Sequence, residues 1–349
     1  MDPNFDQRPQ VGQPYAYAPA PAHPFNRRAL FITGNVLGLG FLGYLLMSLL
    51  FSIIVGRVDT LYDLYVNDTL CSYLLEILYS YMCVGLPFLI VYYILKRRTR
   101  RYRDLVLPYG APYKTGEAVL LVFAALGVCF LGSIAANYFA AYADAYGFGF
   151  LSYYEMLEPE PVPAGLMGAV VLVLRSALIP ALLEEFAFRG VVLQSLRRYG
   201  DWFAIVSSAV LFGLVHGKMT QIPFAVIAGV AMGYCAVVTG SLRPGIAVHF
   251  LNNFVSVIVT LASARLGEGA SVMLSNVLVY VFIGLGLVML VIYLLRKPNA
   301  LRLRPARDPS LRGKGRALFL APVLLIAVLW LVWYALCDIS AFAEWIGVA

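Results

Sequence analysis

Charged residues are scarce in this sequence. Only 13% of its 349 residues are Asp, Glu, Lys or Arg, about half of the ~25% that soluble globular domains carry. Hydrophobic residues make up 61%, and the mean hydropathy is +0.80. This balance excludes an ordinary soluble protein and predicts an all-α bundle of transmembrane helices. The net charge of +7 comes from basic residues at the ends of apolar runs. We therefore expect this charge to set membrane orientation, and we expect no nucleic-acid partner.

Paired cysteines and metal-binding motifs are also missing. The five cysteines are scattered without a CxxC pair, which argues against a disulfide framework and a cysteine-based zinc site. No HExxH motif is present, and the chain holds only three histidines. No internal repeat is visible, so the sequence gives no support to an inverted-repeat transporter.

Nine hydrophobic segments approach the length needed to cross a ~30 Å hydrocarbon core. Before them, residues 1–28 hold six prolines and are interpreted as a disordered, Pro-rich cytoplasmic tail. We expect N-terminal transmembrane helices at 29–164, a catalytic helix core at 165–264, and C-terminal helices with a basic cytoplasmic loop at 265–349. The predicted spans lie at about 29–55, 71–95, 117–142, 166–196, 202–219, 222–240, 244–264, 272–295 and 316–337.

Basic residues are concentrated on one side of this predicted topology. If the N-terminus is cytoplasmic, 21 of the 26 Lys and Arg residues fall in cytoplasmic segments. The positive-inside rule therefore favours about nine spans with the N-terminus inside. We expect a multi-pass protein of the cell membrane. If the source is a bacterium, this is the plasma membrane.

Three polar motifs lie inside predicted spans, where ionisable groups cost several kcal/mol and usually serve a function. The first is Glu-Glu-x-x-x-Arg at 184–189. Glu185 and Arg189 are four residues apart and are expected to form an ion pair. Glu184 is turned about 100° away from them, which leaves its carboxylate available for chemistry. Arg175, in the same span, is expected to snorkel outward.

The second and third motifs each contain a histidine. Phe212 lies one turn before His216 and is expected to pack beneath its imidazole. Glu184 and His216 both lie roughly 20 Å from the inner surface, so a short turn between their helices would place them side by side. His249 and Asn253 share a helix face at four-residue spacing. Taken alone, His216 is more typical of a hydrogen-bonded core histidine, and His249 with Asn253 of an interhelical hydrogen-bond pair, than of catalysis.

Together, Glu-Glu-x-x-x-Arg, Phe-x-x-x-His and His-x-x-x-Asn, in this order and in separate hydrophobic helices, resemble the CPBP family (CAAX protease and bacteriocin-processing, or Abi). That family includes the Ras-converting type of CAAX prenyl protease. The resemblance covers about 165–264 and implies an intramembrane endopeptidase. It implies that Glu184 and His216 activate water and that His249 and Asn253 stabilise the oxyanion. The other motif positions would support them: Glu185, Arg189 and Phe212.

Two mechanisms stay open for such a site. Family members are described as metalloproteases, and a metal-free, glutamate-driven mechanism is also proposed for them. Zinc could bind Glu184, His216 and His249, with one position left for water, but the amide of Asn253 is a poor zinc ligand. We favour the mechanism that requires no cofactor.

The resemblance implies hydrophobic or lipid-anchored peptides or proteins as substrates, beside membrane lipid as the other partner. Two other classes of function are compatible with the same residues. One is a non-catalytic chaperone or immunity protein on the same scaffold. The other is a proton-coupled transporter, which would also keep Glu and His within the membrane.

The predicted topology is testable by cysteine labelling from either side of the membrane. We expect the segments at 96–114 and 296–316 to be labelled from the cytoplasm and the segment at 143–164 from outside, because the first two are basic and the third carries acidic residues. Labelling of 296–316 from outside would contradict the nine-span topology.

Overall fold

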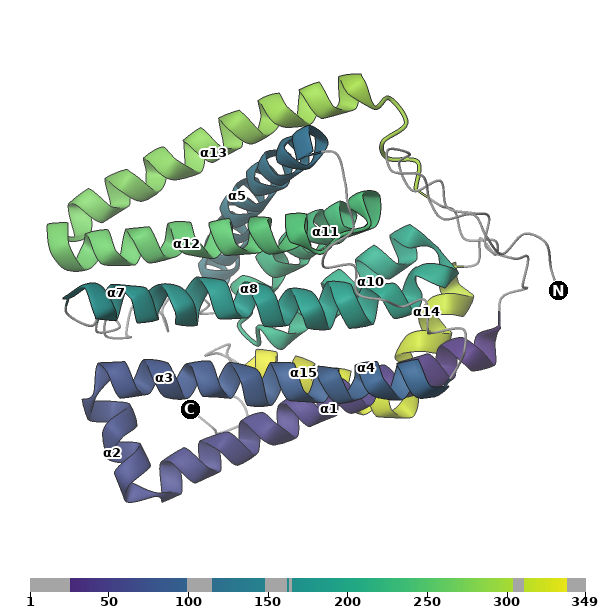
Figure 1. Cartoon of the computed structure of the whole chain (residues 1–349), viewed down its shortest axis with the longest axis horizontal. Helices are drawn as coiled ribbons and strands as arrows, with labels where there is room; N and C mark the ends of the chain where they lie inside the picture. Colours follow the sequence, from purple (N-terminus) through teal and green to yellow (C-terminus); the bar gives the residue numbers. More distant parts are fainter. Residues whose placement is uncertain (1–25, 99–114, 148–161, 163–164, 304–310, 338–349) are drawn as a thin grey trace.

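The computed structural model describes residues 26–98, 115–147, 162, 165–303 and 311–337, and all regular structure in these ranges is helical (Figure 1). This confirms the predicted all-α fold. The predicted tail at 1–28 lies almost wholly outside the described residues. The elements are α1 (Arg27–Arg57), α2 (Asp59–Asn67), α3 (Thr69–Tyr79), η1 (Ser80–Gly85), α4 (Leu86–Arg98), α5 (Thr115–Ala145), α7 (Gly165–Val173), η3 (Leu174–Leu178), α8 (Ile179–Glu184), η4 (Glu185–Leu193), α9 (Gln194–Leu196), η5 (Arg197–Tyr199), α10 (Asp201–Val215), α11 (Gln221–Thr239), α12 (Arg243–Leu266), α13 (Glu268–Arg296), α14 (Leu311–Phe319) and α15 (Pro322–Cys337).

Seven continuous helical segments of the described chain are long and apolar enough to cross a membrane. An eighth span results if α14 and α15, which meet at a bend of 80°, are counted together. The remaining predicted span, the fifth, at 202–219, corresponds to the 15-residue helix α10. At 1.5 Å per residue this helix covers about 22 Å, which is less than the ~30 Å hydrocarbon core. The cytoplasmic placement of the N-terminus stays a prediction.

The helical segment Gly165–Tyr199 carries the first motif and is irregular on both sides of it. Two π-helical stretches, η3 and η4, flank the short helix α8. Pro180, in the first turn of α8, has no backbone N–H and cannot donate to the carbonyl four residues earlier. Extra residues in π-helical turns are common at functional sites because they change where side chains point.

The helices form two groups on either side of this segment. In Figure 1, α1, α3 and α4 lie below the rod formed by α7 and α8, while α12 and α13 lie above it. An aromatic cluster joins the groups. Phe41 of α1 packs against Phe88 of α4 at 5.1 Å and against Phe188 of η4 at 6.0 Å between ring centroids. The N-terminal helices are therefore part of the same hydrophobic core as the helices that carry the three motifs.

Small residues bring α10 and α11 close together. A Cβ atom added at Gly229 of α11 would lie 3.0 Å from the Cα atom of Ala209 in α10. One turn away, a Cβ atom at Gly213 of α10 would lie 2.5 Å from Val226 of α11. The small-residue positions thus allow the two backbones to approach, as such residues do in membrane bundles.

The outward snorkelling expected for Arg175 is wrong. Its guanidinium forms an ion pair with Glu76 of α3 and lies over the ring of Tyr73, with 4.4 Å from Cζ to the ring centroid. A partner on a neighbouring helix lowers the cost of a charge in apolar surroundings more than a long reach to the interface would. The pair joins α3 to η3.

Candidate active site

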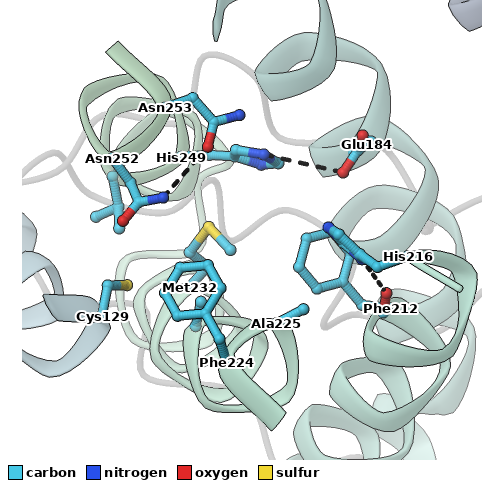
Figure 2. A pocket seen from close by; sticks show the side chains of 12 residues that line it. Cys129, Glu184, Phe212, His216, Phe224, Ala225, Met232, His249, Asn252 and Asn253 are labelled. Carbon is cyan, nitrogen blue, oxygen red and sulfur yellow. Dashed lines mark hydrogen bonds and ion pairs between the residues drawn. The ribbon is translucent and has the colours of Figure 1, made fainter. Parts of the chain in front are cut away.

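The three motifs meet at one cavity. Glu184, His216, His249 and Asn253 all line it, and its volume of about 70 Å³ has room for a few water molecules. Figure 2 shows the Glu184 carboxylate and the two imidazoles pointing toward the same space. These four side chains come from three places, the end of α8, the end of α10, and α12, and helix α11 adds further residues to the lining. Residues up to 69 positions apart in the chain (184 to 253) are thus brought together.

A buried charge cluster lies next to the cavity. Glu185 and Arg189, both almost inaccessible, form the ion pair expected from their spacing, with 2.9 Å between Nη1 and Oε1. The same Oε1 atom lies 3.1 Å from Nδ1 of His249. Because a carboxylate oxygen accepts hydrogen bonds, Nδ1 of His249 is the donor in this contact. Glu185 therefore orients the imidazole of His249 and sends its Nε2 atom toward the cavity.

Glycine at position 245 makes room for this cluster. An added Cβ atom there would lie 2.7 Å from Oε2 of Glu185, closer than real Cβ contacts allow. Gly245 lies in the first turn of α12, where the backbone N–H groups and the helix dipole favour a nearby carboxylate. The start of α12 thus adds to the stabilisation of the Glu185 charge, and any larger residue at 245 would displace the carboxylate.

Glu184 has fewer partners than Glu185. Its Oε2 atom is buried and has no hydrogen-bond partner among the described residues. The nearest basic atom recorded for it is Nε2 of His249, at 3.8 Å, which is longer than a hydrogen bond. A buried carboxylate oxygen without a partner is costly, and a water molecule in the adjoining cavity would supply one. The position of this oxygen therefore fits the activation of water.

The contacts of His216 fix its tautomer. Its Nδ1 atom lies 2.8 Å from the carbonyl oxygen of Phe212, four residues earlier. A carbonyl only accepts, so Nδ1 carries the proton and Nε2 keeps its lone pair. The ring of Phe212 stands edge-on to His216 at 4.7 Å and to His249 at 5.9 Å between centroids. On the other side, the guanidinium of Arg189 lies 4.2 Å from the centre of the Phe212 ring. Phe212 thus packs against both imidazoles and against the guanidinium.

The amide of Asn253 is held by a backbone carbonyl in the π-helical stretch η3. Its Nδ2 atom donates to the carbonyl of Ser176 at 3.1 Å. In a regular α-helix that carbonyl would accept from residue 180, but Pro180 has no N–H. The proline therefore leaves an acceptor for Asn253. The second N–H of the amide is not used by this contact.

The structure adds residues to which the motifs assigned no role. Asn252 lines the cavity and donates from Nδ2 to Oδ1 of Asn253 at 3.2 Å. An apolar wall completes the lining with Phe224 and Met232 of α11 and Val248 of α12. The sequence contained a signal for Asn252, which directly precedes the motif residue Asn253. It contained none for the apolar lining, because the residues that line a cavity and those that face lipid are equally apolar in a membrane helix.

The donor set was also compared with the needs of zinc. Among the described residues, no three His, Cys, Asp or Glu side chains lie close enough together to hold a metal ion. Nδ1 of His216 and Nδ1 of His249 contact a carbonyl and a carboxylate, which metal-bound histidines also do, so these contacts do not argue against zinc. Only the spacing of the side chains fails to form a three-ligand site.

Comparison with known families agrees with the motif analysis. Residues 166–255 match the family described as Rce1-like, type II CAAX prenyl endopeptidase Rce1-like. The matched segment contains all the motif residues and about a quarter of the chain. It confirms the predicted resemblance to the CPBP and CAAX protease family. No curated protein and no solved structure matches the chain.

Replacing Pro180 by alanine tests how Asn253 is held. The new N–H would compete for the carbonyl of Ser176, so Asn253 should lose its anchor. We expect activity to fall by up to about 10²–10³-fold, as for one lost oxyanion donor, with the protein still folded.

The matched control is Pro87→Ala. Pro87 also follows a π-helical stretch but lies outside the cavity lining, and this variant should keep its activity. Full activity in Pro180→Ala would show that the Ser176 carbonyl does not position Asn253.

Proposed function

Because the catalytic candidates lie within a segment that matches a family of endopeptidases, we propose that this multi-pass membrane protein is an intramembrane endopeptidase. It hydrolyses peptide bonds of hydrophobic or lipid-anchored substrates. The observation that carries the proposal is the single cavity shared by Glu184, His216, His249 and Asn253. These four residues supply the two functions that peptide hydrolysis needs, a base for water and donors for the oxyanion.

Glu184 and His216 act on water. The partnerless Oε2 atom of Glu184 accepts the proton as the water oxygen attacks the scissile carbonyl. His216, with its Nε2 lone pair free of the Phe212 contact, shares this proton and passes it to the leaving nitrogen. The C–N bond then breaks to give a carboxylic acid and an amine.

His249 and Asn253 act on the oxyanion. The amide of Asn253 keeps one N–H after donating to Ser176. A proton on Nε2 of His249 would give a second donor.

The wall of the cavity supports an apolar substrate. Phe224, Met232 and Val248 offer no hydrogen-bonding group to a substrate side chain, and the site lies among membrane-spanning helices. Peptides that enter it come from the lipid phase or are anchored to it. Prenylated CAAX proteins are the substrates named for the matched family, and lipid-anchored peptides are the wider class proposed for this chain.

Cleavage assays on Glu184→Gln test this function. The variant should accumulate as folded protein but lose cleavage, because the amide cannot accept the proton of water. Proteomic comparison of membranes that contain the active protein with membranes that contain Glu184→Gln would identify the substrate.

Arg189→Ala is the contrasting variant. It strands the Glu185 carboxylate in apolar surroundings and should lower folded yield. Equal cleavage by wild type and Glu184→Gln would refute the proposal.

We also propose that catalysis needs no metal. On this view, purified active protein contains less than one zinc per chain and resists strong chelators. His249→Ala and Asn253→Ala should each reduce the rate by a similar factor, on the order of 10²–10³ for one oxyanion donor. A zinc enzyme would behave differently, because His249→Ala would remove bound metal and activity together. Stoichiometric zinc that disappears in His249→Ala would overturn the metal-free mechanism.

A further inference from the structure

The end of helix α10 leaves backbone carbonyls that need partners. The last four carbonyls of an α-helix have no donor within the helix. Helix α10 ends at Val215, after about 22 Å, and so ends inside the bundle. In such surroundings an unpaired carbonyl costs several kcal/mol. The partners that these carbonyls find therefore determine how the turn bearing His216 is held.

Two of these carbonyls are capped by side chains. His216 itself donates from Nδ1 to Phe212 at 2.8 Å. The hydroxyl of Tyr44, on α1, donates to the carbonyl of Val215 at 3.3 Å. Tyr44 thus reaches the residue directly before His216 from a helix that lies outside the matched segment 166–255.

We propose that Tyr44 is a positioning residue for His216. If the Val215 carbonyl had no donor, it would compete with the Phe212 carbonyl for the Nδ1 proton of His216. The ring could then turn or change tautomer, and Nε2 would no longer present its lone pair to the cavity. Because the Tyr44 hydroxyl donates to the Val215 carbonyl, Nδ1 of His216 donates to the Phe212 carbonyl alone. Nε2 of His216 therefore stays unprotonated and faces the cavity as an acceptor. Tyr44 acts through His216 and does not touch substrate.

The surroundings of Tyr44 support a specific role. Tyr79 lies within hydrogen-bonding reach of Tyr44, and its hydroxyl is 2.8 Å from Oγ of Ser48. These groups hold Tyr44 in place from α1 and α3. Glu184 is near enough to act on Tyr44 electrostatically. The competing explanation is that the hydrogen bond from Tyr44 only stabilises the packing of α1 against α10. That explanation predicts no change in the tautomer of His216.

The test is Tyr44→Phe in the full chain, which removes one hydroxyl and keeps the ring. For the rate, which depends on the proposed peptidase function, we expect kcat to fall by about 10- to 100-fold, the scale of a small misplacement of a catalytic group, with KM unchanged. For His216, ring-nitrogen NMR should show the Nδ1–H tautomer in the wild type and a shift toward Nε2–H in Tyr44→Phe. The chain holds only three histidines, so His23→Gln and His249→Gln variants assign the signals.

Tyr293→Phe is the matched control, because it removes the hydroxyl of another buried tyrosine, whose recorded contact is with Tyr234 of α11. It should leave the His216 tautomer as in the wild type. An unchanged tautomer in folded Tyr44→Phe would overturn the proposal, whether or not the protein cleaves peptides. Loss of cleavage in the wild type would refute only the peptidase function, since the NMR measurement needs no substrate.

A second substitution covers the case in which Tyr44→Phe does not fold. A fluorotyrosine at position 44 keeps the hydroxyl and therefore the cap on Val215, but its more acidic hydroxyl is a stronger donor. Because the cap is kept, ring-nitrogen NMR should still show the Nδ1–H tautomer of His216. An Nε2–H tautomer in this variant, with the hydroxyl still present, would overturn the positioning role.

Discussion

A carboxylate at the centre of an apolar bundle is tolerated only when opposite charge and hydrogen-bond donors surround it. Glu185 has no exposed surface, and the arrangement of the catalytic helices follows from that constraint. Arg189 approaches it from the next turn of the same segment, His249 from α12, and Gly245 leaves room for its second oxygen. Because Arg189 also reaches the carbonyl of Gly229 on α11, the cluster holds three elements around the cavity. Glu184, one residue away, is thereby placed at the cavity without being neutralised itself.

Sequence reasoning reached the fold class and brought the motif residues together, because both depend on signals that are strong in a membrane protein. Ionisable residues stand out against apolar spans, and four-residue spacing reports a shared helix face. The predicted end at 219 was wrong, because α10 ends at Val215 and Gly217 takes a left-handed backbone conformation with a φ of 68°. The partner of Arg175 was missed because Glu76 lies 99 residues away in the chain. The different roles of Glu184 and Glu185 could be predicted, because only Glu185 lies four residues before Arg189. The contact of Tyr44 with the His216 turn could not be predicted, since a lone tyrosine in a membrane helix carries no pattern.

Irregular backbone holds two of the four candidate catalytic side chains, Asn253 and His216. The carbonyl of Ser176 is left by Pro180 and accepts from Asn253. The carbonyls of Phe212 and Val215 are left by the end of α10 and accept from His216 and Tyr44. In water such groups would be hydrated, but within a bundle they must be satisfied by protein. The interruptions in the helices therefore supply fixed acceptors, and each acceptor selects the orientation of one polar side chain. Polar side chains thus donate hydrogen bonds to the carbonyls that the helix irregularities leave free. This explains why helix irregularities and polar motif residues occur close together in the structure.

The short span of α10 also has a consequence for the lipid around it. Trp202 and Val206 expose part of their surface along this helix, yet the helix is about 8 Å shorter than a ~30 Å hydrocarbon core. Bilayers respond to a short hydrophobic segment by becoming locally thinner. The headgroup layer would then dip toward the connector after Val215, where Lys218 is exposed. Hydrolysis consumes water as a second reactant, and such a dip would shorten the distance over which that water has to leave the aqueous phase.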